Sequence, residues 1–339
     1  MSFSLEVKKF VNSENVGAFV DILLPAIEQA HAPKKAKAAP APVEASAAAE
    51  GAEVLADAPE APVAAEAPAG PEEEREPLKL HYIEAGEGEP LILVHTVGQS
   101  FYTWRNVFER LSAYYRVIAI DLPGHGYSGR AYTFGYTIEE YAFALRAFMD
   151  EMRIQSAHFA AFSLGCAYVM RLAADEPSRV GRIVLLSPGG ISPEMPLPIR
   201  LIDSPLLGFA ASFFYNMRTV EKLLHEAVFD LTNITPEVVA AYYRTVCDGA
   251  ARRALRMSVQ RFDEEPVLAS LRDVPTPVLI LQGSEDKWHL PEHGAEVYHA
   301  ALRNAASAVV RNAGHLMHEE KPERIIAALL EFIPAELPQ

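Results

Sequence analysis

Short apolar runs alternate with amphipathic stretches over the last three quarters of this 339-residue chain. The runs have the length and the apolar character of buried strands. We expect strands over residues 80–83, 91–94, 116–120, 157–162, 182–186, 277–281 and 307–310. Apolar residues at helical spacing predict helices over residues 101–115, 137–152, 164–174, 292–302 and 321–332. This order predicts an α/β fold, with a mostly parallel central sheet flanked by helices.

The alternation of strands and helices stops after residue 190 and resumes at residue 273. Residues 191–272 instead have a helical pattern. An insert of this length is too long for a passive loop. The sequence therefore predicts a core formed by residues 78–190 and 273–335, and a helical insert formed by residues 191–272.

The N-terminal quarter of the chain, residues 1–77, has a different pattern. Residues 31–77 contain 17 Ala and 8 Pro with almost no large apolar side chain, so we expect a disordered linker. Within residues 1–30, Ser13 can cap a helix and apolar residues recur at helical spacing, which predicts a short amphipathic helix. That helix either packs on the main domain or docks on a protein or a lipid surface. We expect residues 1–77 to be dispensable for catalysis, because the pattern of the core is complete without them.

Charge and cysteine content exclude several classes of protein. The chain has 30 Lys and Arg against 45 Asp and Glu, a net charge of −15. Nucleic-acid binders need a basic face, so we expect no nucleic-acid partner. Cys166 and Cys247 are the two cysteines of the chain, which excludes a disulfide framework and a thiolate metal site. Because the chain has neither a secretory signal pattern nor an apolar stretch of transmembrane length, we expect a cytoplasmic protein.

The segment Ala161–Cys166 (AFSLGC) lies between a predicted strand and a predicted helix. Ser163 has a small residue, Ala161 or Gly165, two positions away on each side. This spacing is typical of a nucleophile elbow, a turn too tight for bulky neighbours that lifts a serine hydroxyl above the sheet edge. The backbone N–H of Leu164, at the helix start, is directed at a developing oxyanion.

A serine nucleophile needs a base, and the base needs an acid to orient it. Asp286 in Gly283–Asp286 (GSED) and His315 in Asn312–His315 (NAGH) each follow a predicted strand. The carboxyl ends of parallel strands meet at one edge of a sheet, where ligands usually bind. We therefore expect Ser163, Asp286 and His315 to lie close together.

With these motifs, residues 78–333 resemble an α/β-hydrolase-fold serine hydrolase of the esterase or lipase type. The resemblance extends to His95–Gly98 (HTVG) and Asp121–Ser128 (DLPGHGYS). It implies that Ser163 is the nucleophile, Asp286 the acid and His315 the general base. The N–H groups of Leu164 and Val97 would form the oxyanion hole, the insert would be a helical cap over the site, and no cofactor or metal is needed. The chain has Thr96 where the family usually has Gly.

Two residues rival these assignments. Glu285 is a second candidate for the acid, but Asp286 fits the Gly-x-x-Asp spacing. His318 lies one helical turn beyond His315, and we expect it at the surface. We expect the remaining candidates to have structural roles. His95, Asp121 and His125 shape loops, and Cys166 packs behind the turn. No carboxylate or Cys pattern with zinc spacing accompanies His289, His293 and His299.

The insert indicates the class of substrate. It is rich in Leu, Phe, Tyr and Met, and those not needed for packing predict an apolar acyl or aryl pocket. Five arginines also lie there, and either one of them binds a substrate carboxylate or they form a solvated helix face. They are Arg244, Arg252, Arg253, Arg256 and Arg261.

The predicted function is hydrolysis of carboxylic esters of small-molecule substrates through an acyl-enzyme. Two alternatives stay open. The same fold and triad occur in carbon–carbon hydrolases of aromatic ring-cleavage products, perhydrolases and acyltransferases. A ligand receptor or a tethered scaffold would keep the fold without catalysis. The substrate-binding residues, the substrate and the oligomeric state are unknown from the sequence.

Overall fold

The computed structural model describes residues 17–24, 77–191 and 194–334. Eight strands form one sheet in the order β1-β2-β4-β3-β5-β6-β7-β8. In chain order they are β1 (Ala18–Ile22), β2 (Leu78–Ala85), β3 (Pro90–Val94), β4 (Arg116–Ile120), β5 (Ala157–Phe162), β6 (Val180–Leu186), β7 (Val278–Gly283) and β8 (Ala305–Val310). The order β4-β3-β5-β6-β7-β8 is parallel throughout, and β2 and β1 extend it antiparallel at one edge. The predicted α/β class with a mostly parallel sheet is confirmed.

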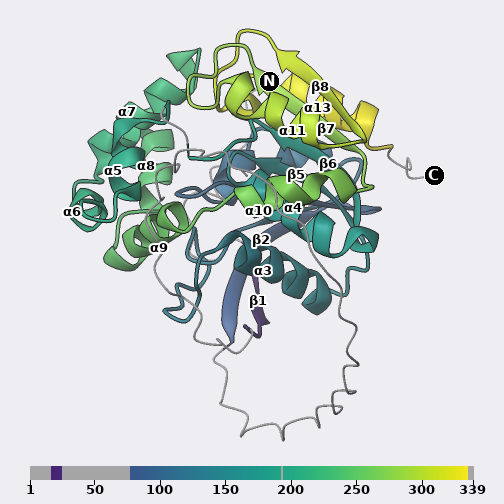
Figure 1. Cartoon of the computed structure of the whole chain (residues 1–339), viewed down its shortest axis with the longest axis horizontal. Helices are drawn as coiled ribbons and strands as arrows, with labels where there is room; N and C mark the ends of the chain where they lie inside the picture. The colour runs from purple at the N-terminus through teal and green to yellow at the C-terminus, as the bar shows by residue number, and fades with distance from the viewer. Residues whose placement is uncertain (1–16, 25–76, 192–193, 335–339) are drawn as a thin grey trace, which may run out of the picture. The chain divides into compact units, whose positions relative to one another are not determined.

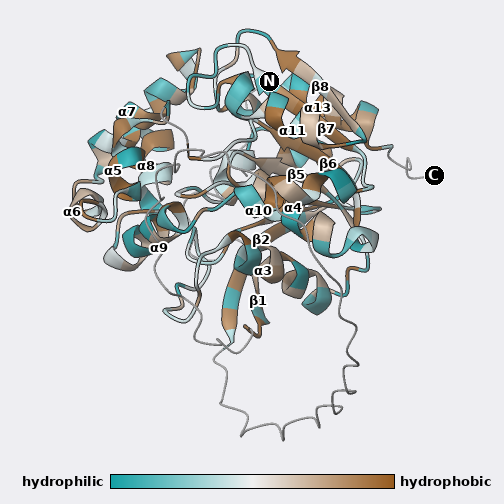
Figure 2. Ribbon diagram, viewed as in Figure 1, coloured by the Kyte–Doolittle hydropathy of each residue, from teal (hydrophilic) through white to brown (hydrophobic). Residues whose placement is uncertain are grey.

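The central strands are apolar along their whole length because helices cover both faces of the sheet. Leu91–Val94 and Val117–Ile120 are fully buried, and Figure 2 shows the strands mostly in the brown of hydrophobic residues. The helices of the core are α2 (Phe108–Leu111), α3 (Ile138–Glu151), α4 (Gly165–Asp175), α10 (Glu265–Ser270), α11 (Ala295–Ala301), α12 (Met317–Glu320) and α13 (Pro322–Phe332). Thr137 and Glu140 form a capping box at the start of α3, which fixes that helix where the sequence predicts it.

The helix predicted over residues 101–115 is wrong in its length. A single 3₁₀ turn, Phe101–Trp104, and the four-residue helix α2 take its place. Phe101, Trp104, Phe108 and Leu111 are all buried, so the apolar spacing that predicted one helix instead serves two short turns packed on the sheet.

Apart from α10, which packs against α4 of the core, the residues of the predicted insert form five α-helices within the part that the structure describes: α5 (Leu197–Asp203), α6 (Gly208–Phe213), α7 (Met217–Ala227), α8 (Pro236–Arg244) and α9 (Gly249–Gln260). Figure 1 shows them gathered beyond one end of the sheet, on the left in that view. The side chains of Asn216, Thr235 and Asp248 cap α7, α8 and α9 at their first turns. Local capping signals and helical apolar spacing therefore agree over the insert. Among the described helices, none has the length and apolar character needed to cross a membrane.

The helix predicted within residues 1–30 is wrong over the residues described there. Residues Ala18–Ile22 form β1, which pairs antiparallel with β2 from Ala18 opposite Tyr82 to Ile22 opposite Leu78. Ile22 and Leu24 are buried, whereas Phe19 and Leu23 are about half exposed. The edge of the sheet supplies hydrogen-bond partners for this backbone, and that long-range pairing overrides the weak local helix pattern. The remainder of residues 1–30 and the predicted linker lie outside the described residues, apart from Pro77.

Candidate active site

Ser163 occupies the turn between β5 and α4. Its φ is +54°, in the left-handed region that non-glycine residues rarely adopt, and its N–H donates to the Leu186 carbonyl at 2.9 Å. A Cβ atom at Gly165 would come within 2.5 Å of the His95 carbonyl oxygen. The turn therefore requires a small residue two positions after Ser163, as expected of a nucleophile elbow.

The structure brings together the three residues predicted to act as a unit. His315 Nε2 lies 3.1 Å from Ser163 Oγ, and His315 Nδ1 lies 2.9 Å from Asp286 Oδ2. All three side chains are buried. Burial acts to raise the pKa of Asp286, but the neighbouring His315 outweighs it and holds that pKa well below its usual value. Asp286 is thus a carboxylate suited to orient the His315 ring.

Asp286 is held by the loop that follows β7. Its Oδ1 accepts from the backbone N–H groups of Trp288 and His289 at 2.9 and 3.1 Å, and the Gln282 side chain donates to Oδ2 at 3.0 Å. Glu285, the rival acid, is exposed and accepts from the Ser284 hydroxyl. The structure thus places Asp286, and not Glu285, against His315.

The loop that carries His315 is tied to the insert through Glu320. The N–H of Gly314 donates to Glu320 Oε2 at 2.6 Å, and the N–H groups of Phe229 and Asp230 donate to Oε1 at 2.8 Å each. Burial raises the pKa of Glu320. Sequence reasoning missed this residue, because an acidic pair before Lys-Pro has the pattern of an exposed helix start.

The predicted oxyanion donors lie beside Ser163. The N–H of Leu164 donates to Thr96 Oγ1 at 3.3 Å, and Val97 follows in the loop after β3. His95 shapes that loop as expected: its Nδ1 lies 2.6 Å from the Thr96 carbonyl oxygen, and its Nε2 accepts from the Leu122 N–H at 2.9 Å. Burial lowers the pKa of His95. The residue that departs from the family pattern, Thr96, therefore puts a hydroxyl group into the predicted oxyanion hole.

His318 is not at the surface, contrary to expectation. It is fully buried, its Nε2 lies 2.7 Å from Thr103 Oγ1, and its ring packs 4.6 Å from that of Phe162. Burial lowers the pKa of His318 to about 3. The residue is neutral and packs behind the site, because α12 turns its side chain towards the sheet.

His289 and His293 lie in different surroundings and have different partners. His289 is buried, its Nδ1 lies 2.8 Å from the Ser187 carbonyl oxygen, and its pKa is lowered by burial to about 4. Its ring meets that of His315 edge-on at 4.8 Å. His293 faces Glu194 at 3.1 Å. Across the described residues, no cluster of His, Cys, Asp and Glu could hold a metal ion.

A cavity of about 620 Å³ opens over Ser163 and His315. Its walls come from both the core and the insert: Thr96, Val97, Gly98, Gln99, Leu164, Met195, Ile199, Tyr215, Val220, Leu223, Leu224, Ala227, Tyr242, Trp288 and Leu316 join the two catalytic candidates. No Asp, Glu, Lys or Arg is among these described wall residues. The cavity is apolar and fits a neutral acyl or aryl group.

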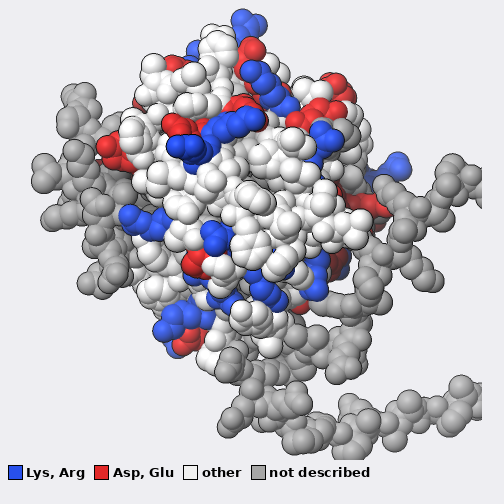
Figure 3. Space-filling view, turned by 90° about the vertical axis from the view of Figure 1, so that its left-hand side faces the viewer, with Lys and Arg blue, Asp and Glu red and all other residues white. Residues whose placement is uncertain are grey.

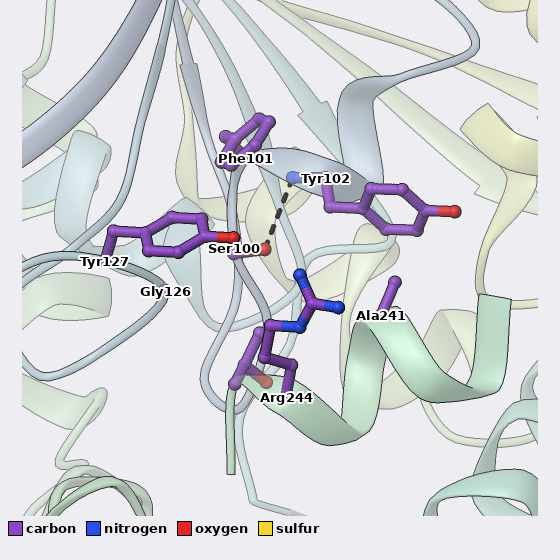
Figure 4. A pocket seen from close by; sticks show the side chains of 8 residues that line it. Ser100, Phe101, Tyr102, Gly126, Tyr127, Ala241 and Arg244 are labelled. Atoms are coloured by element: carbon purple, nitrogen blue, oxygen red, sulfur yellow. Dashed lines mark hydrogen bonds between the residues drawn. The ribbon is translucent and has the colours of Figure 1, made fainter. Parts of the chain in front are cut away.

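The five insert arginines are all absent from the described wall of that cavity. Arg244 instead lines a second, shallower pocket with Ser100, Tyr102 and Tyr127, and Figure 4 shows its side chain beside Ser100 and Tyr102. Arg253 and Arg261 bond backbone carbonyl groups of the core, and Arg252 one within the insert. The guanidinium of Arg256 covers the Phe209 ring.

Comparisons with known proteins identify the family of the chain. Residues 89–322 match the family described as alpha/beta hydrolase fold. The chain is 25% identical over 272 residues to a 2-hydroxy-6-oxo-6-phenylhexa-2,4-dienoate hydrolase of Comamonas testosteroni, covering 77% of this chain and 93% of that protein. It is 28% identical to a 2-hydroxy-6-oxononadienedioate/2-hydroxy-6-oxononatrienedioate hydrolase of Paraburkholderia phymatum, covering 76% and 91%.

Solved structures share the fold. The chain resembles Cfl2 of Burkholderia cenocepacia with a TM-score of 0.69 and 23% identity, covering 75% of this chain and 92% of that one. It resembles the 2-hydroxy-6-oxo-6-phenylhexa-2,4-dienoate hydrolase of Rhodococcus sp. strain RHA1 with a TM-score of 0.67 and 21% identity, covering 76% and 95%. At these identities the likeness concerns the fold.

Proposed function

Because this chain belongs to the α/β hydrolase fold family and is a hydrolase, we propose that it cleaves carboxylic esters of neutral acyl or aryl acids. The observation that carries the proposal is the cavity over Ser163, whose described wall is mostly apolar and contains no Asp, Glu, Lys or Arg. A neutral ester needs only apolar contacts and the oxyanion donors in such a cavity. The insert acts as the cap, since it forms one wall.

In the proposed mechanism, His315 Nε2 takes the proton of Ser163 as its Oγ attacks the ester carbonyl. Asp286 keeps the His315 ring in the tautomer that exposes Nε2 to Ser163 and stabilises the imidazolium that forms. The oxyanion accepts from the N–H groups of Leu164 and Val97. His315 then gives its proton to the leaving alcohol, and water attacks the acyl-enzyme in the same manner.

A second candidate is cleavage of a carbon–carbon bond in a ring-cleavage product, because two of the relatives carry dienoate or dienedioate hydrolase names. Such a substrate carries a carboxylate. Burying an unpaired carboxylate costs several kcal/mol even after the surrounding structure relaxes. No Arg or Lys is among the described residues that line the cavity, and this composition favours the ester.

The first prediction concerns the nucleophile. Ser163→Ala is expected to lower kcat for short p-nitrophenyl esters by at least about 10³-fold, because the remaining groups cannot form the acyl-enzyme. Ser187→Ala is a matched control, since Ser187 is also buried, lies at a strand end and has a φ of +44°. It should keep its activity and its labelling by a fluorophosphonate probe. Labelling of the Ser163→Ala protein would place the nucleophile elsewhere, and an unlabelled wild type would support the non-catalytic alternative.

A comparison of kcat/KM between an ester and a ring-cleavage dienone distinguishes the two candidate reactions. We expect kcat/KM for the best p-nitrophenyl ester, over a series of acyl chain lengths and aryl acids, to exceed that for a carboxylated ring-cleavage dienone. A higher kcat/KM for the dienone would replace the ester proposal with carbon–carbon hydrolysis while leaving the triad intact.

A further inference from the structure

The outer surface of the insert exposes an unusual number of large apolar side chains. Thirteen large hydrophobic residues are exposed within the described part of the chain, and seven of them lie between residues 197 and 217. Leu206 is 92% exposed and Phe214 74%. We call these seven the apolar patch: Leu197, Leu206, Leu207, Phe209, Phe213, Phe214 and Met217. A concentration of this kind marks a binding site on a soluble protein.

The apolar patch is not the packing face of its helices. That role belongs to other side chains of the same elements: Ile199 and Ile202 of α5, and Val220, Leu223 and Leu224 of α7, are buried. A surface helix normally turns polar residues outward once its inner face is packed. Helix α7 follows this rule, with Arg218, Glu221 and Lys222 exposed. The apolar patch lies instead at the first residues of α5 and α7, on α6 and in the turns on either side of α6. Packing of the inner helix faces does not account for these exposed side chains.

Basic side chains accompany the apolar patch although the chain as a whole has a net charge of −15. The Arg256 guanidinium lies 5.1 Å from the centre of the Phe209 ring, and the exposed Arg200 and Arg218 belong to α5 and α7. The acidic residues nearby in sequence are Glu194, Asp203 and Glu221. Figure 3, which faces the insert, shows a broad field of uncharged atoms with Lys, Arg and some Asp and Glu around it.

We propose that the insert docks on an anionic lipid surface through the apolar patch, with Arg200, Arg218 and Arg256 contacting the headgroups. Apolar side chains at the acyl boundary and basic side chains at the headgroups are the two contributions that bind a protein to an anionic interface. A second copy of the chain is the other possible occupant, and the test below distinguishes it from a lipid surface. Docking would not require catalysis, so the proposal is independent of the ester reaction.

The position of the patch gives docking a use. Ile199 of α5 and Val220 and Leu223 of α7 wall the cavity over Ser163, so the helices that carry the patch outside also hold the substrate inside. Lipid contact on one side would therefore act directly on the elements that shape the cavity.

The test is sedimentation of the full chain, carrying Ser163→Ala to prevent turnover, with sucrose-loaded vesicles. We expect binding to vesicles of phosphatidylcholine and phosphatidylglycerol mixed three to one, weakening with salt as expected of headgroup contacts, and weaker binding to phosphatidylcholine alone. Adding Phe213→Ser and Phe214→Ser should reduce partitioning at least about tenfold. Arg200→Glu with Arg218→Glu should remove the preference for anionic vesicles.

Val309→Ser is the matched control, because Val309 is 64% exposed but lies on β8. It should bind vesicles as the parent protein does. Melting temperatures should agree among all variants, since the changed residues are exposed. Absence of binding to either vesicle, or equal binding by the Phe213→Ser/Phe214→Ser protein, would overturn the proposal. A concentration-dependent dimer that these two substitutions dissolve, without vesicle binding, would assign the patch to a second copy of the chain.

Discussion

At the scale of single residues, Thr96 is the departure from the family pattern with the clearest chemical consequence. Its hydroxyl lies 3.3 Å from the Leu164 nitrogen and lines the same cavity as Ser163. A hydroxyl group both accepts and donates. In the proposed mechanism the oxyanion takes the Leu164 N–H, which leaves the Thr96 hydroxyl free to turn its proton to the same oxygen.

Thr96→Val should therefore lower kcat about 10²-fold, the usual cost of removing one oxyanion donor, with little change in KM. Thr96→Ser keeps the hydroxyl and is the control, expected within a few-fold of the wild type. Steady-state kinetics on a short p-nitrophenyl ester decide the matter. If Thr96→Val raises kcat, the hydroxyl competes with the oxyanion for Leu164 and does not assist it.

At the scale of elements, β1 extends the sheet of the hydrolase core. It pairs with β2 along its whole length, and Ile22 enters the core. The segment before residue 78 therefore cannot all be a separate appendage. In our proposal this segment is still dispensable for catalysis, because the triad lies in the loops after β5, β7 and β8. It is not dispensable for stability.

Ile22→Ala should destabilise the fold by about 2–5 kcal/mol, because it leaves a cavity beneath the edge of the sheet. Leu23→Ala removes a similar side chain that points outward and is 57% exposed, so it should cost no more than about 0.5 kcal/mol. Urea unfolding of both proteins measures the difference. Equal stabilities would mean that β1 contributes no core contact.

At the scale of the whole molecule, buried neutral histidines make the unfolding free energy depend on pH. Burial lowers the pKa of His125 and of His318 to about 3 and that of His289 to about 4. The unfolded chain takes up protons at these residues near pH 6.5, and the folded protein does not. The contribution of these histidines to stability is therefore full well above pH 6.5 and is lost progressively as the pH falls from 6.5 towards about 3 to 4.

His318→Gln should weaken this dependence. At pH 5, each such histidine costs about 2 kcal/mol of unfolding free energy relative to pH 7 and above. The variant should therefore lose about 2 kcal/mol less than the wild type between pH 8 and pH 5, whatever its stability at pH 8. Replacement of the exposed His299 by Gln is the control. Parallel urea curves for His318→Gln and the wild type across this pH range would contradict the prediction.

Sequence alone determined the parallel sheet, the helical insert and the positions in the chain of Ser163, Asp286 and His315, whose side chains meet in the structure. Each of these rests on local signals: buried strands have apolar runs, Ser163 needs small neighbours in its turn, and Asp286 and His315 follow strand ends. A parallel sheet brings its strand ends to one edge, so local order was enough to predict that the three side chains meet.

Tertiary structure alone decided features that depend on partners far away in the chain. β1 is a strand because β2, much later in the chain, offers it an edge. Glu320 holds the His315 loop to residues 229 and 230. His318 is buried because the orientation of α12 directs its side chain towards the sheet. The insert arginines also lie outside the cavity because of tertiary packing. Helical spacing in the sequence predicts which residues share a face, but only packing decides which part of the molecule that face contacts.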